Sequence, residues 1–260
     1  TAKGWHGPAW MGVMRLDNRV AYTMTCLFVI AMLIVGAELL FAAEKVRLQL
    51  KRQHGFQFAG YYAAEQQGYY EQAGLKVELV AATPGLKVLD EVMAGRAQFG
   101  VGTSSLLLDY AKGQDVRLLA NVFQHSALVL LARPTAAEPD IQALRGQKVM
   151  LESGAEELQA YLSREGLTAQ DYQLIAHRTS LPDLINGQVA AISAYSSNEP
   201  LILQQAGVAF YQFTPRSAGI DFYGDNLFTS NKLWQKKPEL VEKFRAASLR
   251  GWSYAMQHPA

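Results

Sequence analysis

The stretch LKVELVAATPGLKVLDEVMAGRAQFGVGTSSLLLDYAKGQ, residues 75–114, decides the fold. It predicts a strand over 75–82, a helix over 85–96, a second strand over 97–102 and a second helix over 104–114. Strands that alternate with helices of about 10 to 15 residues indicate βαβ units. We therefore expect an α/β protein built on parallel strands.

The same alternation extends to both sides of this stretch. Upstream, VRLQL (46–50) predicts a strand and AGYYAAEQQGYYEQAG (59–74) a helix. Downstream, the pattern pauses at RPTAAEPD (133–140), which has a linker's composition, and restarts at LRGQKVMLES (144–153). This second run closes at VAFYQFTP (208–215). Two runs of similar size predict two lobes with a cleft between them, where ligands bind beyond the carboxyl ends of strands.

The domain organisation follows from the two runs. We assign residues 1–43 to a leader, residues 44–132 together with 216–260 to the first lobe, and residues 133–215 to the second lobe. The chain stops immediately after a helical pattern, so we expect it to be a fragment of a longer protein.

Composition excludes several classes of function. The net charge is +1 and no basic stripe is present, so a nucleic-acid partner is not expected. A single cysteine, Cys26, excludes an internal disulfide, a thiolate zinc cluster and a CxxC redox pair. The sequence has no HExxH pair and no GxSxG elbow. We therefore predict no catalytic residue, no metal site and no cofactor.

An apolar segment lies near the N-terminus. It runs from Val20 to Ala37 without a charge, Arg15 and Arg19 precede it, and small residues follow over 36–43. This order is typical of a secretory signal. The segment is also close to the roughly 20 residues that span a bilayer, so an uncleaved anchor is the alternative. Either interpretation predicts a periplasmic or other extracytoplasmic location, with or without attachment to the membrane.

Hydroxyl-bearing residues follow the strand over 97–102. Thr103 and Ser104 come directly after Gly100 and Gly102 and precede an apolar helical run. Hydroxyls at a helix start bond free backbone N–H groups, which can also hold a polar ligand. The GK[ST] ending of a P-loop and the third glycine of a dinucleotide fingerprint are missing. Thr103 and Ser104 are therefore candidates for a ligand site, with an ordinary helix cap as the alternative.

An aromatic cluster follows the first predicted strand. Phe56, Gln57 and Tyr61 offer ring faces and polar ends that suit a flat heterocycle. Core packing is the alternative, and we favour it for Phe58 and Tyr62.

Two further candidates come from the second half of the chain. Asn198 and Glu199, within SSNEP, follow a predicted strand and open a helix. The carboxylate of Glu199 can accept N–H bonds from an amino-substituted ring, and capping of the helix is the alternative. Asp225 lies in GIDFYGDNLF (219–228), where turn chemistry explains the glycine and aspartate residues equally well.

The sequence resembles a known family over most of its length. The run LQLKRQHGFQFAGYYAAEQQGYYEQAGLKVEL (48–79) looks like the opening of thiamine-pyrimidine (hydroxymethylpyrimidine) type substrate-binding proteins of ABC transporters. Their superfamily also includes sulfonate and nitrate binders and the thiamine-pyrimidine synthases. The further matches, in the family's order, are FGVGTSSLLLDYAKG, VFQHSALVLLAR, LRGQKVM, NEP, GIDFYGDNLFTSNKL and FRAASLRGWSYAMQHP.

The resemblance implies a type 2 periplasmic-binding fold that closes on a small molecule. In the family's pyrimidine binders, aromatic residues stack on the ring while acidic and amide groups meet its nitrogens. By matching position, the ligand-binding residues would be Phe56, Gln57, Tyr61, Thr103, Ser104, Asn198, Glu199 and Asp225. One departure matters, because Arg52 stands where relatives often have a tryptophan and Gly55 where they have a glutamine. If that tryptophan stacks on the ligand, a more anionic, sulfonate-like solute gains ground.

Three functions are compatible with this resemblance. The first, which we favour, is capture of a thiamine-precursor pyrimidine for import by an ABC permease. The second is the ligand-sensing domain of a membrane-bound signalling protein, fused to a histidine kinase or a cyclic-dinucleotide enzyme. The third is a thiamine-pyrimidine synthase, whose members carry a cysteine-rich CCCFC motif that is missing here. We therefore expect a binding protein and not an enzyme.

Overall fold

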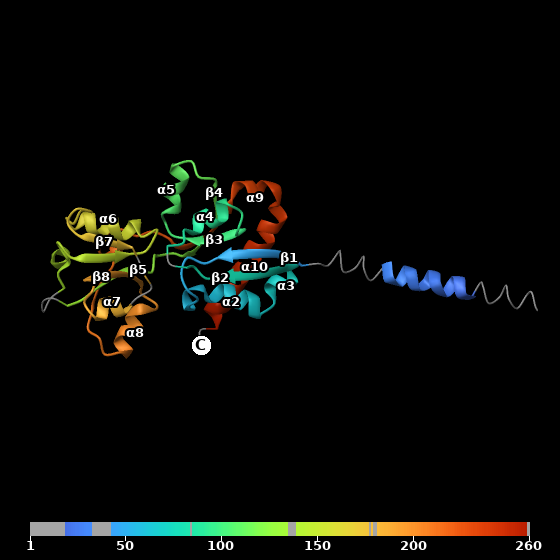
Figure 1. Ribbon diagram of the computed structural model, residues 1–260, viewed down its shortest axis with the longest axis horizontal. Coiled ribbons are helices and arrows are strands. Elements are labelled where there is room, and N and C mark those ends of the chain that lie inside the picture. Colours follow the sequence, from blue (N-terminus) through green and yellow to red (C-terminus); the bar gives the residue numbers. More distant parts are fainter. Residues whose placement is uncertain are drawn as a thin grey trace, which may run out of the picture. The chain divides into compact units, whose positions relative to one another are not determined.

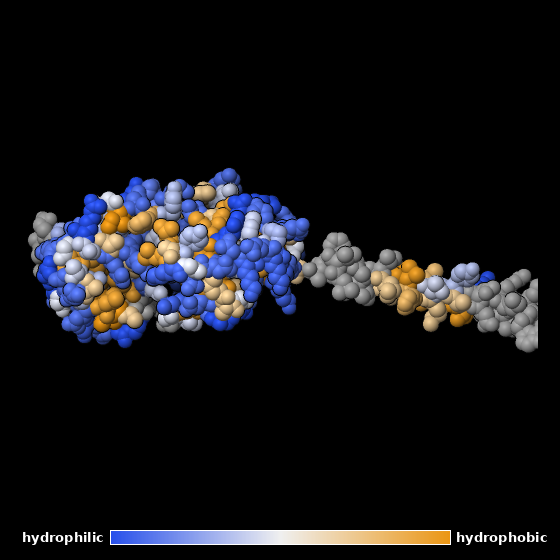
Figure 2. Space-filling model, turned by 90° about the horizontal axis from the view of Figure 1, so that it is seen from above, coloured by the Kyte–Doolittle hydropathy of each residue, from blue (hydrophilic) through white to orange (hydrophobic). Residues whose placement is uncertain are grey.

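The computed structural model describes residues 19–32, 43–83, 85–134, 139–176, 178 and 181–258 (Figure 1). The chain forms two compact units, Thr1–Glu44 and Lys45–Ala260. In the first unit, residues 19–32 form a helix whose side chains are exposed, and Figure 2 shows hydrophobic residues on its surface. The remainder of the apolar segment, residues 33–37, lies outside the described residues.

None of the helices in the described part of the chain is both long enough and apolar enough to cross a bilayer.

The second unit contains two five-stranded sheets, which we name sheet A and sheet B. Sheet A has the order β2 (Leu75–Val80), β1 (Glu44–Gln49), β3 (Phe99–Gly102), β10 (Gly224–Ser230), β4 (Val116–Phe123). β1 and β3 are parallel, whereas β10 runs antiparallel to both β3 and β4. β10 is therefore a central strand of a sheet whose other strands all come from the first half of the chain.

Sheet B has the order β7 (Gln173–Ala176), β6 (Lys148–Leu151), β8 (Ala191–Tyr195), β5 (Leu128–Ala132), β9 (Tyr211–Phe213). β6 is parallel to β7 and β8, while β5 is antiparallel to β8 and β9. The α/β prediction is confirmed, but the expectation of parallel strands is correct only in part, because β5 and β10 reverse direction.

Helices cover both faces of sheet A. One face packs against α2 (Ala59–Gln66), α3 (Tyr69–Gln72) and α10 (Pro238–Gln257), and the opposite core contains residues of α4 (Val88–Met93) and α5 (Leu106–Ala111). Aromatic rings stack at the centre of the first core, where Phe244 lies 3.8 Å from Phe99 and 5.5 Å from Tyr70, between ring centroids. The short α9 (Asn231–Lys236) contributes partly buried residues to the same core.

Sheet B is covered in the same manner. One core includes α6 (Glu156–Arg164) and the 3₁₀ turn η2 (Ile141–Leu144), and the other includes α7 (Leu181–Ile185) and α8 (Glu199–Gln205). Strand β8 is buried along its whole length because helices pack on both of its faces. Two further 3₁₀ turns, η1 (Phe56–Phe58) and η3 (Pro215–Ala218), lie in the connections.

The chain crosses between the sheets twice, after β4 and before β10. The first crossing lies between Phe123 and Leu128, because β5 already pairs within sheet B. The sequence pattern predicts residues 128–132 in the first lobe, whereas these residues form β5 of sheet B. Apolar patterning identifies a buried strand but does not say in which sheet it pairs, which explains the difference.

Candidate functional site

A cleft of about 990 Å³ is lined by residues from both sheets. From the sheet A side come Lys51 and Arg52, shortly after β1, and Thr103, directly after β3. From the sheet B side come Glu152, directly after β6, and Glu156 at the start of α6. The polar lining thus lies at the carboxyl ends of parallel strands, which is where α/β sheets bind ligands.

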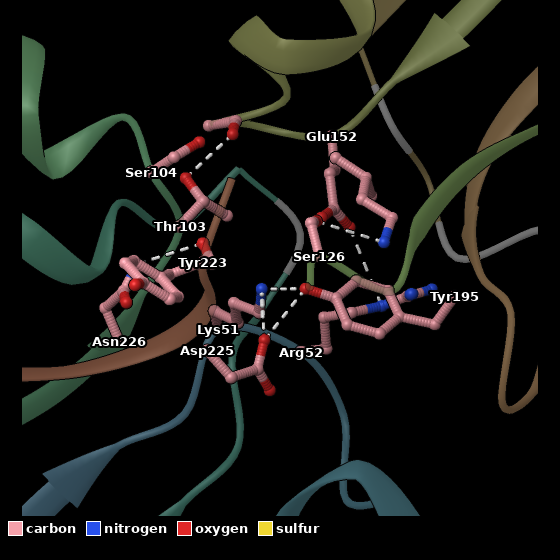
Figure 3. Close-up of polar contacts among 12 residues, drawn as sticks. Lys51, Arg52, Thr103, Ser104, Ser126, Glu152, Tyr195, Tyr223, Asp225 and Asn226 are labelled. Carbon is pink, nitrogen blue, oxygen red and sulfur yellow. Dashed lines mark hydrogen bonds and ion pairs between the residues drawn. The ribbon is translucent and has the colours of Figure 1, made fainter. Parts of the chain in front are cut away.

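Lys51 connects three elements at the base of this cleft. Its Nζ atom lies 2.7 Å from Oδ1 of Asp225 in β10 and also donates a hydrogen bond to the hydroxyl of Tyr195, at the end of β8 (Figure 3). The Tyr195 hydroxyl donates to the same Asp225 oxygen at 3.0 Å. Burial raises the pKa of the Asp225 carboxyl, and the nearby Lys51 opposes this rise.

Asp225 also has an unusual backbone. Among the described residues it is the one non-glycine residue with a positive φ, at 49°. Such conformations are strained for most side chains and cluster at functional sites, although aspartate tolerates them better than most residues. The buried carboxylate of Asp225 lies between Lys51, after β1, and Tyr195, at the end of β8.

Arg52 makes a second set of charged contacts. Its Nη2 atom forms an ion pair with Oε1 of Glu199, and its Nε lies 3.6 Å from Oε2 of Glu152. The guanidinium carbon lies 4.9 Å from the centroid of the Tyr195 ring, within the range of a cation–π contact. The second oxygen of Glu199 accepts a hydrogen bond from the backbone N–H of Tyr195 at 2.8 Å. Glu199 is therefore fixed from both sides.

Glu157 joins the two sheets at another point. Ser104, after β3, donates to Oε2 of Glu157 at 3.2 Å, and Ser126, in the crossing before β5, donates to Oε1. Burial raises the pKa of the Glu157 carboxyl, and the hydrogen bonds from Ser126 and Ser104 oppose the rise. Nearby, Thr103 Oγ1 donates to the carbonyl of Gly154 at 2.8 Å.

Several buried polar atoms around this cluster have no hydrogen-bond partner within the described residues. They include Nη1 of Arg52, Oε1 of Glu152, Oε2 of Glu156 and Oδ2 of Asp225. Each such atom costs about 1–3 kcal/mol when it is left unpaired in the interior. A ligand or an altered side-chain arrangement that satisfied them would be favoured.

The structure brings half of the expected site residues together. Thr103 lines the cleft, Ser104 bonds Glu157, and Glu199 and Asp225 belong to the buried cluster beneath it. Glu199 and Asp225 lie behind Arg52 and Lys51, which are the side chains that line the cleft itself.

The other four expected residues lie outside the cleft lining. Phe56 is 77% exposed, and Asn198 is exposed and makes no side-chain cap bond. Gln57 is buried, and Tyr61 is fully buried in the core of sheet A, where its ring contacts Trp252 edge-on at 5.6 Å. Tyr61 therefore packs in the core, which was the alternative to a place in the ligand site.

The residues predicted from the sequence do not include Lys51, Tyr195, Glu152, Glu157 or Ser126. A usable signal is present for three of them, because Tyr195 ends a strand, Glu152 directly follows one and Lys51 lies two residues beyond one. Polar residues at the carboxyl ends of strands are candidates for ligand contact. Arg52 was noted only as a departure from the family pattern.

Comparison with known proteins places these features in a family. The NMT1/THI5-like family model matches residues 55–260. The riboflavin-binding protein RibY of Chloroflexus aurantiacus is 25% identical over 233 residues, which cover 83% of this chain and 64% of that protein. A "Putative thiamine biosynthesis protein" of Haemophilus influenzae is 26% identical over 232 residues, covering 84% of this chain and 71% of that protein. The chain thus spans about two thirds of the length of these relatives.

Solved structures show the same fold. The periplasmic aliphatic sulphonate-binding protein SsuA of Escherichia coli superposes with a TM-score of 0.61 at 16% identity, covering 82% of this chain and 74% of that chain. The alkanesulfonate-binding protein SsuA of Xanthomonas axonopodis pv. citri bound to MOPS gives a TM-score of 0.58 at 19% identity, covering 84% and 82%. The two sheets of this chain, with the cleft that both of them line, therefore have the fold of periplasmic binding proteins. With the family model matched over residues 55–260, the chain belongs to the NMT1/THI5-like family.

Proposed function

We propose that this protein is an extracytoplasmic solute-binding protein or domain that captures a thiamine-precursor pyrimidine by closure of its two lobes, for import by an ABC permease. The observation that carries the proposal is the cleft of about 990 Å³, to which both sheets contribute charged and hydroxyl-bearing residues. A cavity of this size is within the range of small-molecule sites.

Contacts across the cleft support closure as the mechanism. Three contacts join a residue that follows a strand of sheet A to a residue on the sheet B side. They are the hydrogen bonds Thr103–Gly154 and Ser104–Glu157 and the ion pair Arg52–Glu199. These contacts form when the two sides approach each other. A ligand that adds contacts to both sides shifts the equilibrium between open and closed forms towards the closed form, which a partner can recognise.

The residues of the cluster favour a flat, amino-substituted nitrogen heterocycle. Carboxylates such as Glu199 accept hydrogen bonds from an amino group, and the Tyr195 ring offers a stacking face. The family name and the thiamine and riboflavin functions in the relatives' names support the same ligand class. Capture of a solute requires no bond to break, so we propose a binding function without catalysis.

We further propose that residues 20–37 export the protein or anchor it to the membrane. The apolar composition of this segment and the two arginines before it support the proposal. Fractionation of cells that express the full chain, followed by N-terminal sequencing, tests it. Recovery of the chain in the cytosolic fraction would contradict it.

A thermal-shift screen of the full chain, purified and stripped of ligand, tests the ligand class. The panel contains hydroxymethylpyrimidine, formylaminopyrimidine, thiamine, riboflavin, taurine and an alkanesulfonate. A ligand at about 100 times its Kd adds about 2.7 kcal/mol of stability, which such a scan detects. We expect stabilisation by a pyrimidine. Stabilisation by the sulfonates alone would overturn the proposed ligand class, and no response to any compound would count against solute capture from this panel.

A further inference from the structure

The guanidinium group of Arg52 occupies a site whose walls suit a planar cation. One wall is the ring face of Tyr195, 4.9 Å from the guanidinium carbon. The other contacts are two carboxylates, Glu199 at Nη2 and Glu152 at Nε, the latter at 3.6 Å. An aromatic face with two carboxylates in reach binds flat cations well, because stacking and charge-assisted hydrogen bonds act together.

This site is enclosed. The side chains of Arg52 and Glu152 are each 10% exposed and that of Glu199 is 9% exposed. Glu199 is held in position independently of Arg52, because the backbone N–H of Tyr195 donates to its second oxygen at 2.8 Å. The backbone N–H of Glu152 donates likewise to Ser193 Oγ at 2.8 Å. The carboxylate of Glu199 and the backbone of Glu152 are thus held by hydrogen bonds that do not involve Arg52, and the Arg52 guanidinium lies between the two residues.

A guanidinium and the edge of an aminopyrimidine share one pattern of atoms. Both are planar and both present an N–C–N edge whose N–H groups can donate to a carboxylate, while their faces stack on aromatic rings. A 4-aminopyrimidine with a protonated ring nitrogen would therefore make the same contacts to Glu199 and Tyr195 as Arg52 makes. The same holds for small amidinium and guanidinium ions.

We infer that Arg52 is a tethered occupant of a planar-cation site formed by Tyr195, Glu199 and Glu152, and that a bound amidine-bearing ring takes this site by displacing the Arg52 side chain. The identity of the natural ligand rests on the proposed function, whereas the cation site rests on the contacts of Arg52 alone. With a tethered competitor, the apparent affinity equals the intrinsic affinity multiplied by the fraction of molecules in which the competitor has left the site. Arg52 thereby sets how much ligand is needed to fill the cleft.

The test uses the full chain with Arg52→Ala, which vacates the site, and Arg52→Lys, which refills it with a compact ammonium. The probe is methylguanidinium chloride, followed by calorimetric titration and thermal shift, with tetramethylammonium chloride at equal ionic strength as the salt control. Arg47→Ala is the matched control variant, because Arg47 lies in β1 and forms an exposed ion pair with Glu78 at 3.0 Å.

We expect Arg52→Ala to bind methylguanidinium about tenfold or more tightly than the wild type, Arg52→Lys and Arg47→Ala do. The double variant Arg52→Ala/Glu199→Gln should lose this gain. If Arg52→Ala lacks a folding transition in the salt control, methylguanidinium should restore the transition. Equal, weak binding by all variants would overturn the inference, as would failure of the probe to restore an unfolded Arg52→Ala.

A second titration separates this inference from the proposed function. If the wild type binds hydroxymethylpyrimidine, Arg52→Ala should bind it more tightly, and weaker binding would show that Arg52 contacts the ligand instead of competing with it. If the wild type binds no pyrimidine while Arg52→Ala binds methylguanidinium, the proposed ligand fails and the cation site stands.

Discussion

The Nζ atom of Lys51 lies 2.7 Å from Oδ1 of Asp225, and both side chains are more than nine-tenths buried. Lys51 follows β1 and Asp225 lies in β10, so the pair joins the beginning of the second unit to the strand that returns from sheet B. The Tyr195 hydroxyl, from β8 of sheet B, bonds both groups. A single buried cluster thus links both sheets at the base of the cleft.

Removal of Lys51 should destabilise the protein strongly. Lys51→Ala leaves the Asp225 carboxylate buried without its cation, and breaking a buried pair in this way typically costs about 3–5 kcal/mol. Urea unfolding at neutral pH measures the loss. Because burial already raises the pKa of Asp225, protonation at lower pH should relieve part of the loss. Lys76→Ala, at an exposed lysine, is the control, and a similar small change in both variants would contradict the prediction.

Glu157 should make the wild type lose stability as the pH rises. Since the pKa of Glu157 is raised on folding by burial, the folded protein holds this proton more tightly than the unfolded chain. The contribution of Glu157 to the free energy of unfolding is complete below the unfolded pKa of 4.5, and it is lost as the pH rises through the folded pKa. The free energy of unfolding of the wild type should therefore fall relative to that of Glu157→Gln across this window.

Glu91 gives a control of opposite sign. The hydrogen bond from Arg96 lowers the pKa of Glu91. The contribution of Glu91 to the free energy of unfolding is therefore present above the unfolded pKa of 4.5 and is lost as the pH falls through the folded pKa. Urea titrations of the wild type, Glu157→Gln and Glu91→Gln from about pH 2.5 to pH 8 make the comparison, because the Glu91 contribution is lost below 4.5. Parallel curves for the wild type and Glu157→Gln would show that the Glu157 pKa does not change on folding.

Thr103→Val should weaken ligand binding with little effect on the fold. The substitution keeps the shape of the side chain but removes the hydrogen bond to the Gly154 carbonyl, which forms across the cleft, together with the local bonds to Ser105. A hydrogen bond of this kind contributes about 0.5–1.5 kcal/mol, which corresponds to an affinity loss of about two- to tenfold. Calorimetry with the tightest ligand of the panel measures it. Thr168→Val, which loses only the local bond from its hydroxyl to Asp171, should bind normally, and equal affinities in both variants would remove Thr103 from closure.

Gly251→Ala should destabilise the packing of α10 on α2. A Cβ atom at Gly251 would lie 2.1 Å from the carbonyl oxygen of Gly60 and 2.6 Å from the Ala64 side chain. Alanine normally stabilises a helix interior by about 1 kcal/mol relative to glycine, but overpacking of about 1–3 kcal/mol should outweigh this gain. A lower Tm is therefore expected. Gly55→Ala is the control, because a Cβ there has no neighbour closer than 3.9 Å, and a raised Tm in Gly251→Ala would contradict the packing.

The alternation of strands and helices could be predicted from the sequence because each element carries its own hydrophobic period. The segment around Asp225 shows the limit of this approach. Turn chemistry was one of two equal interpretations of its glycine and aspartate residues, yet Gly224–Ser230 is the interior strand β10, in which Asp225 has a positive φ. Pairing with β3 and β4, which lie far away in sequence, decides this structure and leaves no local signal.

The site was predictable to the extent that its residues follow strands or match the family. Thr103, Ser104, Glu199 and Asp225 could be found in this way, although the partners of Glu199 and Asp225 could not. Tyr195 ends a wholly buried strand, and its place in the site could not be predicted because the sequence does not show that its hydroxyl meets Lys51. Phe56 looked like a stacking residue because it belongs to an aromatic cluster after the first predicted strand, but it lies on the surface.

The central claim, capture of a pyrimidine through the buried carboxylates of the cleft, is tested most directly by one calorimetric comparison. Hydroxymethylpyrimidine is titrated into the full-length wild type and into Glu199→Ala, with circular dichroism to confirm that both are folded. The account predicts single-site binding by the wild type and an affinity about tenfold or more weaker in Glu199→Ala. Equal affinities would exclude Glu199 from the site, and absence of binding to the folded wild type would contradict the account.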